Sequence, residues 1–153
     1  MTHTKTLSTT AIAFALLFLA TAFTSCERCY GSEPKADVKK TLNLKLLAAI
    51  IQVESGGDSQ AHNRDENAVG LLQIRPIMVA ECNRILKKQG SPVRYTIDDR
   101  WTPERSIEMF WIFQRYWNPE MDAETAARMW QGGPAFKRTP RNNAYWQLIK
   151  EKL

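Results

Sequence analysis

The sequence lacks an apolar run of the roughly 18 to 20 residues that a helix needs to span a bilayer, and this excludes an ordinary transmembrane protein. It also lacks internal repeats and low-complexity tracts, and its 153 residues include only three cysteines. A chain of this length buries a sizeable core without support from disulfides or a metal. With 44% hydrophobic and 24% charged residues, the composition excludes wholesale disorder and predicts one globular domain.

The charge of the sequence is unbalanced. There are 21 Lys and Arg residues against 16 Asp and Glu residues, which leaves a formal net charge of +5. An excess of positive charge favours an anionic partner such as a nucleic acid, a membrane surface or an acidic polymer. The sequence contains no recognised nucleic-acid-binding motif, so we expect no nucleic acid among the partners.

The first 25 residues are typical of a secretory signal peptide. A short start with one positive charge, at Lys5, precedes the almost entirely apolar segment 11–23. Two ends are open: residues 20–22 (Ala-Thr-Ala) fit ordinary cleavage, whereas residues 23–26 (Phe-Thr-Ser-Cys) resemble a lipobox, although Leu is usual at its first position. We therefore expect a periplasmic protein, either freely secreted or tethered to the membrane through a lipidated Cys26.

The three cysteines permit three interpretations. If Cys26 is lipidated, Cys29 and Cys82 remain to form one disulfide in an oxidising periplasm. A metal site of these three cysteines and His62 is the rival, but the sequence has no second closely spaced pair of ligands, and we expect no metal. Cys82 also continues an apolar helix face, three residues before Ile85, which is typical of a buried core thiol.

Glycine and proline divide the remaining chain into helical segments. Apolar periodicity and end signals predict helices over 37–55, 76–89, 103–117, 123–130 and 141–152, with Thr102 and Asp122 as N-caps. Residues 26–36 are predicted to be a flexible tether, and the irregular segment 58–75 has room for a small hairpin. A mainly α domain over 37–153 follows. One helix carries a stripe of aromatic residues that is more typical of a core than of a sugar platform: Phe110, Trp111, Phe113, Tyr116 and Trp117.

A carboxylate continues the apolar face of the first predicted helix. Leu47, Ile50, Ile51 and Glu54 follow one another at positions i, i+3, i+4 and i+7, and so share one face. Glu54 also lies in the last turn, where the helix dipole disfavours negative charge. Burial and dipole both raise the pKa of the carboxyl group, and an acid that stays protonated near neutral pH suits general-acid catalysis. The alternative is a solvated Glu that turns outward at a helix end.

Three ordered motifs accompany Glu54. Residues 51–57 (IQVESGG) place a Glu-Ser pair at a helix end, and residues 68–76 (AVGLLQIRP) contain a Gly-Leu-Leu-Gln segment. Residues 127–134 (ARMWQGGP) carry an aromatic residue followed by Gln-Gly-Gly, and Tyr145 stands on the last predicted helix. Together these motifs resemble those of the lytic transglycosylase (SLT-domain) and goose-type lysozyme family, over about residues 42–150.

The resemblance implies a lysozyme-like fold, with helices around a cleft, and cleavage of the β-1,4 bond between N-acetylmuramic acid and N-acetylglucosamine in peptidoglycan. It implies that Glu54 protonates the leaving oxygen and then takes a proton from the muramyl C6 hydroxyl. A 1,6-anhydro ring then closes with one carboxyl group and without a cofactor. The resemblance also implies that residues 37–153 are the catalytic domain of a monomer that binds peptidoglycan glycan strands. The substrate-binding residues implied are Ser55 (through a hydrogen bond to Glu54), Gln73, Gln131, Gly132 and Tyr145.

Departures from the family pattern leave other functions open. Gln131 stands where the family usually has Asn, and its longer side chain fits a peptidoglycan-binding module that has lost turnover. Leu72 replaces the usual Met, which conserves volume. A second carboxylate would favour hydrolysis by water, as in a muramidase. Spacing selects none of the candidates, which are Asp58, Asp65, Glu66, Asp98 and Asp99.

Overall fold

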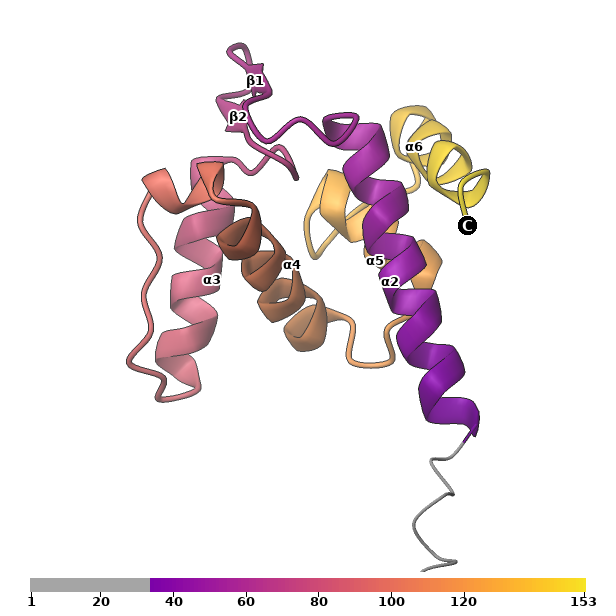
Figure 1. Cartoon of the computed structure of the whole chain (residues 1–153), viewed down its shortest axis with the longest axis horizontal. Helices are drawn as coiled ribbons and strands as arrows, with labels where there is room; N and C mark the ends of the chain where they lie inside the picture. The colour runs from indigo at the N-terminus through magenta and orange to yellow at the C-terminus, as the bar shows by residue number, and fades with distance from the viewer. Residues whose placement is uncertain (1–33) are drawn as a thin grey trace, which may run out of the picture. The chain divides into compact units, whose positions relative to one another are not determined.

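The structure is a computed structural model that describes residues 34–153, with side chains from Asn43 onward. In chain order its elements are helix α2 (Pro34–Glu54), strands β1 (His62–Asn63) and β2 (Ala68–Val69), helix α3 (Pro76–Lys88), the 3-10 helix η1 (Asp98–Trp101), and helices α4 (Pro103–Trp117), α5 (Ala123–Gly132) and α6 (Pro140–Lys150) (Figure 1). The predicted signal peptide, Cys26, Cys29 and all but the last three residues of the predicted tether lie outside the described residues.

The helices begin where the local sequence chemistry favours a start. A proline occupies the first turn of α3, α4 and α6, where its missing N–H costs no helical hydrogen bond. Asp122 caps α5 by accepting a hydrogen bond from the Thr125 backbone N–H at 2.7 Å, as predicted. Thr102 stands at the N-cap of α4 but makes no side-chain capping bond. Helix α2 begins at Pro34, three residues before its predicted start, so the end of the predicted tether is helical.

Residues 39–153 form one unit in which helices pack in pairs. Helix α3 packs against α4, and α5 packs against α6 (Figure 1). The two short strands pair antiparallel, with His62 opposite Val69 and Asn63 opposite Ala68, which confirms the predicted hairpin. This hairpin lies toward the end of α2 that carries Glu54 (Figure 1). The prediction of a mainly α domain with one small hairpin is confirmed.

One hydrophobic core joins these elements, and the predicted apolar stripe of α2 leads out of it. Leu47 and Ile50 are buried, whereas Ile51 and Glu54 are only partly buried, so that Glu54 reaches the edge of the core. The aromatic stripe of α4 is also divided. Phe110 and Phe113 are fully buried, Trp111 and Tyr116 are partly buried, and Trp117 is 38% exposed. The core interpretation therefore holds for Phe110 and Phe113 and fails at Trp117, because the side chain of this last residue of α4 is partly open to solvent.

Cys82 is a buried core residue on α3. Its free thiol has no exposed area and donates a hydrogen bond to the Met109 carbonyl at 3.4 Å. Burial raises the pKa of the thiol to about 12, so it remains protonated at neutral pH. The core interpretation of Cys82 is confirmed, and its pairing with Cys29 stays a prediction because Cys29 lies outside the described residues.

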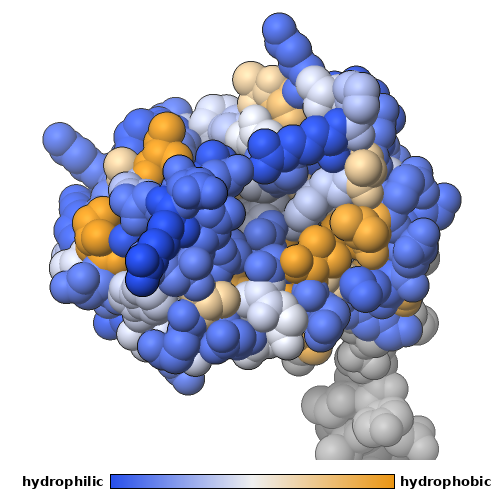
Figure 2. All heavy atoms as spheres, turned by 90° about the horizontal axis from the view of Figure 1, so that it is seen from above, coloured by the Kyte–Doolittle hydropathy of each residue, from blue (hydrophilic) through white to orange (hydrophobic). Residues whose placement is uncertain are grey.

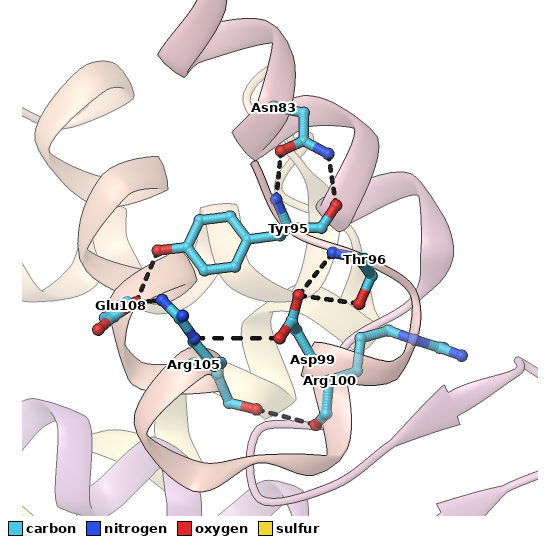
Figure 3. A network of polar contacts seen from close by, with 8 residues as sticks. Asn83, Tyr95, Thr96, Asp99, Arg100, Arg105 and Glu108 are labelled. Atoms are coloured by element: carbon cyan, nitrogen blue, oxygen red, sulfur yellow. Dashed lines mark hydrogen bonds and ion pairs between the residues drawn. The ribbon is translucent and has the colours of Figure 1, made fainter. Parts of the chain in front are cut away.

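A network of polar contacts orders the irregular segment between α3 and α4 (Figure 3). The Asn83 side chain accepts from the Tyr95 backbone N–H and donates to the Tyr95 carbonyl, both at 2.8 Å. The Tyr95 hydroxyl donates to Glu108 at 2.8 Å, and Asp99 accepts from the Thr96 backbone N–H at 2.6 Å. Asp99 is therefore committed to holding this segment.

The surface of residues 39–153 is mainly hydrophilic on the face drawn in Figure 2, with separate hydrophobic patches. No helix within residues 34–153 is both long and apolar enough to cross a membrane. Three of the large apolar side chains that are exposed, Ile77, Trp117 and Leu148, line cavities. This position distinguishes them from single exposed apolar residues, which need no explanation.

Candidate active site

Glu54, the last residue of α2, lines a cavity of ≈ 480 Å³. The β-hairpin, the segment before α3, the end of α5 and helix α6 form its walls, together with the end of α2. The polar side chains that join Glu54 in the lining include Glu66, Gln73, Arg75, Gln131, Arg141 and Tyr145. Ile77 and Leu148, which are 73% and 50% exposed, add apolar surface to it. A concave site with apolar walls and a few convergent polar groups is the usual form of a ligand-binding site.

Tyr145, on α6, holds the Glu54 carboxyl group. Its hydroxyl donates a hydrogen bond to Glu54 Oε1 at 2.6 Å, between residues 91 positions apart in the chain. In Figure 1, α6 lies beside the C-terminal end of α2, which makes this contact possible. Burial, and then the neighbouring Glu54 charge, raise the pKa of Tyr145 well above its ordinary value. The phenol therefore stays protonated and remains a donor toward Glu54.

The carboxyl group of Glu54 is an acid whose pKa lies near neutrality. Burial is the largest cause that raises the pKa, from 4.5 to about 7, and the negative charge of Glu66 raises it further. The hydrogen bond from Tyr145 and the positive charges of Arg75 and Arg141 act in the opposite direction. Glu54 thus titrates near neutral pH, which agrees with the raised pKa predicted from the apolar stripe.

Glu66 is the one of the five candidate second carboxylates that the described chain brings to this cavity. Arg141 donates to Glu66 Oε1 at 2.9 Å, and Arg75 Nη1 lies 4.0 Å from Glu66 Oε2. The hydrogen bond from Arg141 is the main cause that lowers the pKa of Glu66, so Glu66 is ionised when Glu54 is neutral. A carboxyl group that titrates near neutral pH and one that stays ionised there therefore share the cavity.

Gln73 stands in the wall of the cavity in a left-handed backbone conformation, with φ of 48°. Its Nε2 donates to the carbonyl groups of Ala61 at 3.2 Å and Gly70 at 3.1 Å, so both N–H groups hold the loop. Among the described residues, none donates a hydrogen bond to its Oε1. Of the Gln73 amide group, only this oxygen is left for the predicted contact with sugars, which stays a prediction.

Ser55 does not make the hydrogen bond to Glu54 that was expected. Its hydroxyl donates to the Leu71 carbonyl at 2.7 Å and lies 3.3 Å from the Ile51 carbonyl, while it accepts from the Gly57 backbone N–H at 3.2 Å. A serine just after a helix end is well placed to bind backbone groups, which explains the difference. Ser55 therefore ties the end of α2 to the segment that carries Gln73.

The third motif contributes less to the Glu54 cavity than expected. Gln131 lines the cavity, but Asn142 donates to its Oε1 at 2.9 Å, which leaves the Nε2 group for a ligand. Gly132 lies outside this cavity and lines a neighbouring one. A Cβ atom at Gly132 would lie 3.0 Å from Phe136 Cβ and 3.3 Å from Asn142 Nδ2. The glycine is thus explained by close packing.

Several residues of the cavity were not predicted from the sequence. Arg75 and Asn63 were not singled out, although Arg75 lies inside the second motif, next to the residues that face the cavity. Glu66 was one candidate among five, and its contact with Arg141 joins residues 75 positions apart. No local pattern in a sequence indicates such a pair, because it depends on how the hairpin and α6 pack.

The fold is mainly α and lysozyme-like, and it places a carboxyl group with a raised pKa at a helix end in a cavity. The family model described as "Transglycosylase SLT domain" matches residues 32–152, and the chain belongs to this family. Members are lytic transglycosylases, so the function is of the peptidoglycan transglycosylase type and peptidoglycan is the substrate that is bound. A comparison with curated proteins finds none that matches this chain.

Proposed function

We propose that this protein cleaves the β-1,4 bond between N-acetylmuramic acid and N-acetylglucosamine with formation of 1,6-anhydromuramyl ends. In this reaction Glu54 first donates its proton to the glycosidic oxygen, and the bond from that oxygen to C1 of the muramyl residue breaks. The Glu54 carboxylate then takes the proton of the muramyl C6 hydroxyl, while the C6 oxygen forms a bond to C1. The proton returns to Glu54, and no water is consumed.

The observation that carries the proposal is the raised pKa of the Glu54 carboxyl group. Burial raises this pKa to about 7, and the group lies in a cavity of an SLT-family fold. An acid with this pKa is protonated often enough to donate at neutral pH, and its conjugate base is strong enough to take a proton back. The hydrogen bond from Tyr145 orients the carboxyl group in both steps. One residue therefore supplies both the acid and the base that the reaction needs.

Hydrolysis is the alternative, and the position of Glu66 is the observation that favours it. Glu66 lines the same cavity as Glu54 and is ionised, so it has the charge state of a base that activates water. Its two arginine partners oppose this role, because an ion pair lowers the basicity of a carboxylate. We therefore place hydrolysis second.

The reaction type is decided by the ends of the products. Purified peptidoglycan digested with the protein is expected to release muropeptides with anhydromuramyl ends, which are lighter than reducing ends by one water in mass spectrometry. Glu66→Gln is expected to retain both cleavage and anhydro ends, because Glu54 alone carries the proposed steps. Reducing ends from the wild type, together with loss of cleavage in Glu66→Gln, would establish the hydrolase instead.

Tyr145→Phe tests whether the hydrogen bond from Tyr145 controls the pKa of Glu54. The bond lowers the pKa of Glu54, so its removal is expected to raise that pKa by about one pH unit. Activity that requires the neutral acid falls as pH rises through about 7 in the wild type, and the fall is expected at higher pH in the variant. The pH–rate profile measures this shift. Tyr95→Phe removes a hydroxyl that binds Glu108 outside the cavity, and it is expected to leave the profile unchanged.

We also propose that the protein acts in the periplasm and is held at the membrane through a lipidated Cys26, with ordinary cleavage after Ala22 as the alternative. The charged start and the apolar segment 11–23 support export. The family supports the location as well, because its substrate is peptidoglycan.

A further inference from the structure

Trp117 lies in a second cavity that shares a wall with the Glu54 cavity. This cavity has a volume of ≈ 550 Å³, and Arg75, Ile77, Met78, Trp130 and Gln131 line both cavities. Trp117 lines only the second one and is 38% exposed, although it is the last residue of a helix whose other aromatic side chains are more deeply buried. The two cavities are thus adjacent, with these side chains between them.

The indole ring of Trp117 is held in place by polar contacts. Its Nε1–H donates to Glu81 Oε1 at 2.8 Å, and Arg84 binds the same carboxylate through Nε and Nη2, both at 2.7 Å. The Arg84 guanidinium lies over the ring, with its carbon 5.8 Å from the ring centroid. The rings of Tyr116 and Trp117 pack in a T-shaped arrangement, with centroids 5.0 Å apart. An exposed aromatic ring with its polar group satisfied loses little freedom when a ligand binds.

We propose that Trp117 is a stacking platform for an N-acetylhexosamine residue of the glycan strand, at a position away from the bond that is cleaved. This inference rests on the proposed function, because the occupant is another residue of the same strand that reaches Glu54. It assigns a substrate contact to a residue outside the three sequence motifs.

The chemistry of the cavity matches an aminosugar. The apolar C–H face of a pyranose ring packs against an aromatic face, and Ile77 and Met78 provide further apolar surface beside it. Gln131 lines the junction of the two cavities, and among the described residues its Nε2 donates no hydrogen bond, so it is available to an acetamide carbonyl. Glu81 is satisfied by Arg84 and Trp117, so it leaves little unbalanced charge to repel a neutral sugar.

Binding tests the platform without requiring turnover. The full chain carrying Glu54→Gln is titrated with chitohexaose, a β-1,4-linked oligomer of N-acetylglucosamine, by calorimetry and by NMR of the indole N–H groups. Trp117→Ala in this background is expected to weaken binding about tenfold. The Trp117 indole resonance, assigned by its loss in Trp117→Phe, is expected to shift on titration. Leu44→Ala removes an exposed apolar side chain that lines neither cavity, and it is expected to leave the affinity unchanged.

Several outcomes would overturn the platform. One is an affinity within twofold of the parent for folded Trp117→Ala, and another is an indole resonance that does not move with chitohexaose. A shift caused by a free stem peptide but not by chitohexaose would assign the cavity to peptide. If Trp117→Ala fails to fold, the titration of the Trp117 indole resonance, assigned with Trp117→Phe, still decides whether chitohexaose binds at Trp117. Wild-type cleavage is measured separately, so loss of the proposed reaction with retained Trp117-dependent binding would reject the function and keep the platform.

Discussion

Glu54→Gln is expected to abolish the cleavage of peptidoglycan, with a loss of at least about a thousandfold. Glutamine keeps the size and the acceptor oxygen that Tyr145 binds, but it has no acidic proton to donate and no basic oxygen to take one back. Because both proposed steps use this one group, no second residue replaces it. Release of soluble muropeptides from purified peptidoglycan measures the effect.

Glu108→Gln provides the matched control for this experiment. Glu108 also accepts a hydrogen bond from a tyrosine hydroxyl, that of Tyr95 at 2.8 Å, but it lies outside both cavities. The same chemical change at this position is expected to leave cleavage within about twofold of the wild type, because surface substitutions away from a site have small effects. Substantial cleavage by Glu54→Gln would reject Glu54 as the acid.

Glu54→Gln is also expected to stabilise the protein at alkaline pH. The pKa of Glu54 is raised in the folded protein, so the stability it contributes is full below pH 4.5 and is lost as pH rises through about 7. The cost of ionising the buried group then reaches on the order of 3 kcal/mol. Glu54→Gln escapes this cost, and its free energy of unfolding in urea should exceed that of the wild type at pH 8 but not at pH 4. An inactive variant that is more stable has not lost activity through unfolding.

Gly70→Ala is expected to destabilise the fold by about 3 kcal/mol or more. Gly70 has φ of 74°, which disfavours a side chain, and a Cβ atom there would lie 2.2 Å from the Arg100 carbonyl oxygen. This neighbour is backbone, so it moves only if the 3-10 helix η1 moves. The Gly70 carbonyl also accepts from Gln73 Nε2 at 3.1 Å, so a shift of this residue disturbs the cavity wall. Urea unfolding measures the loss.

Gly56→Ala separates the two causes of that destabilisation. Gly56 also has a left-handed backbone, with φ of 65°, but a Cβ atom there would meet nothing within 4 Å among the described residues. Only the backbone penalty applies, and we expect a loss of about 1 kcal/mol. Equal losses for the two variants would show that the contact with Arg100 is not the reason for the glycine in the second motif.

The helices and the acid were predictable because their signals are local. Apolar residues at helical spacing, prolines in first turns and the Asp122 cap predicted helix positions to within a few residues. The place of Glu54 at the end of an apolar stripe predicted a raised pKa, since burial acts on whatever side chain continues a buried face. The predicted bond from Ser55 to Glu54 was wrong because the Ser55 hydroxyl donates instead to the Leu71 carbonyl, 16 positions away.

The sequence by itself determined a mainly α domain, the helix that ends in Glu54 and the motifs that place the chain in its family. Only the tertiary structure decided which groups surround that carboxyl group. Tyr145 reaches Glu54 across 91 positions and Arg141 reaches Glu66 across 75. It also decided that Phe110 is core whereas Trp117 opens into a cavity, although both stand on one helix. The reason is physical: periodicity reports which residues share a face, but which part of that face is covered depends on the packing of segments distant in the chain.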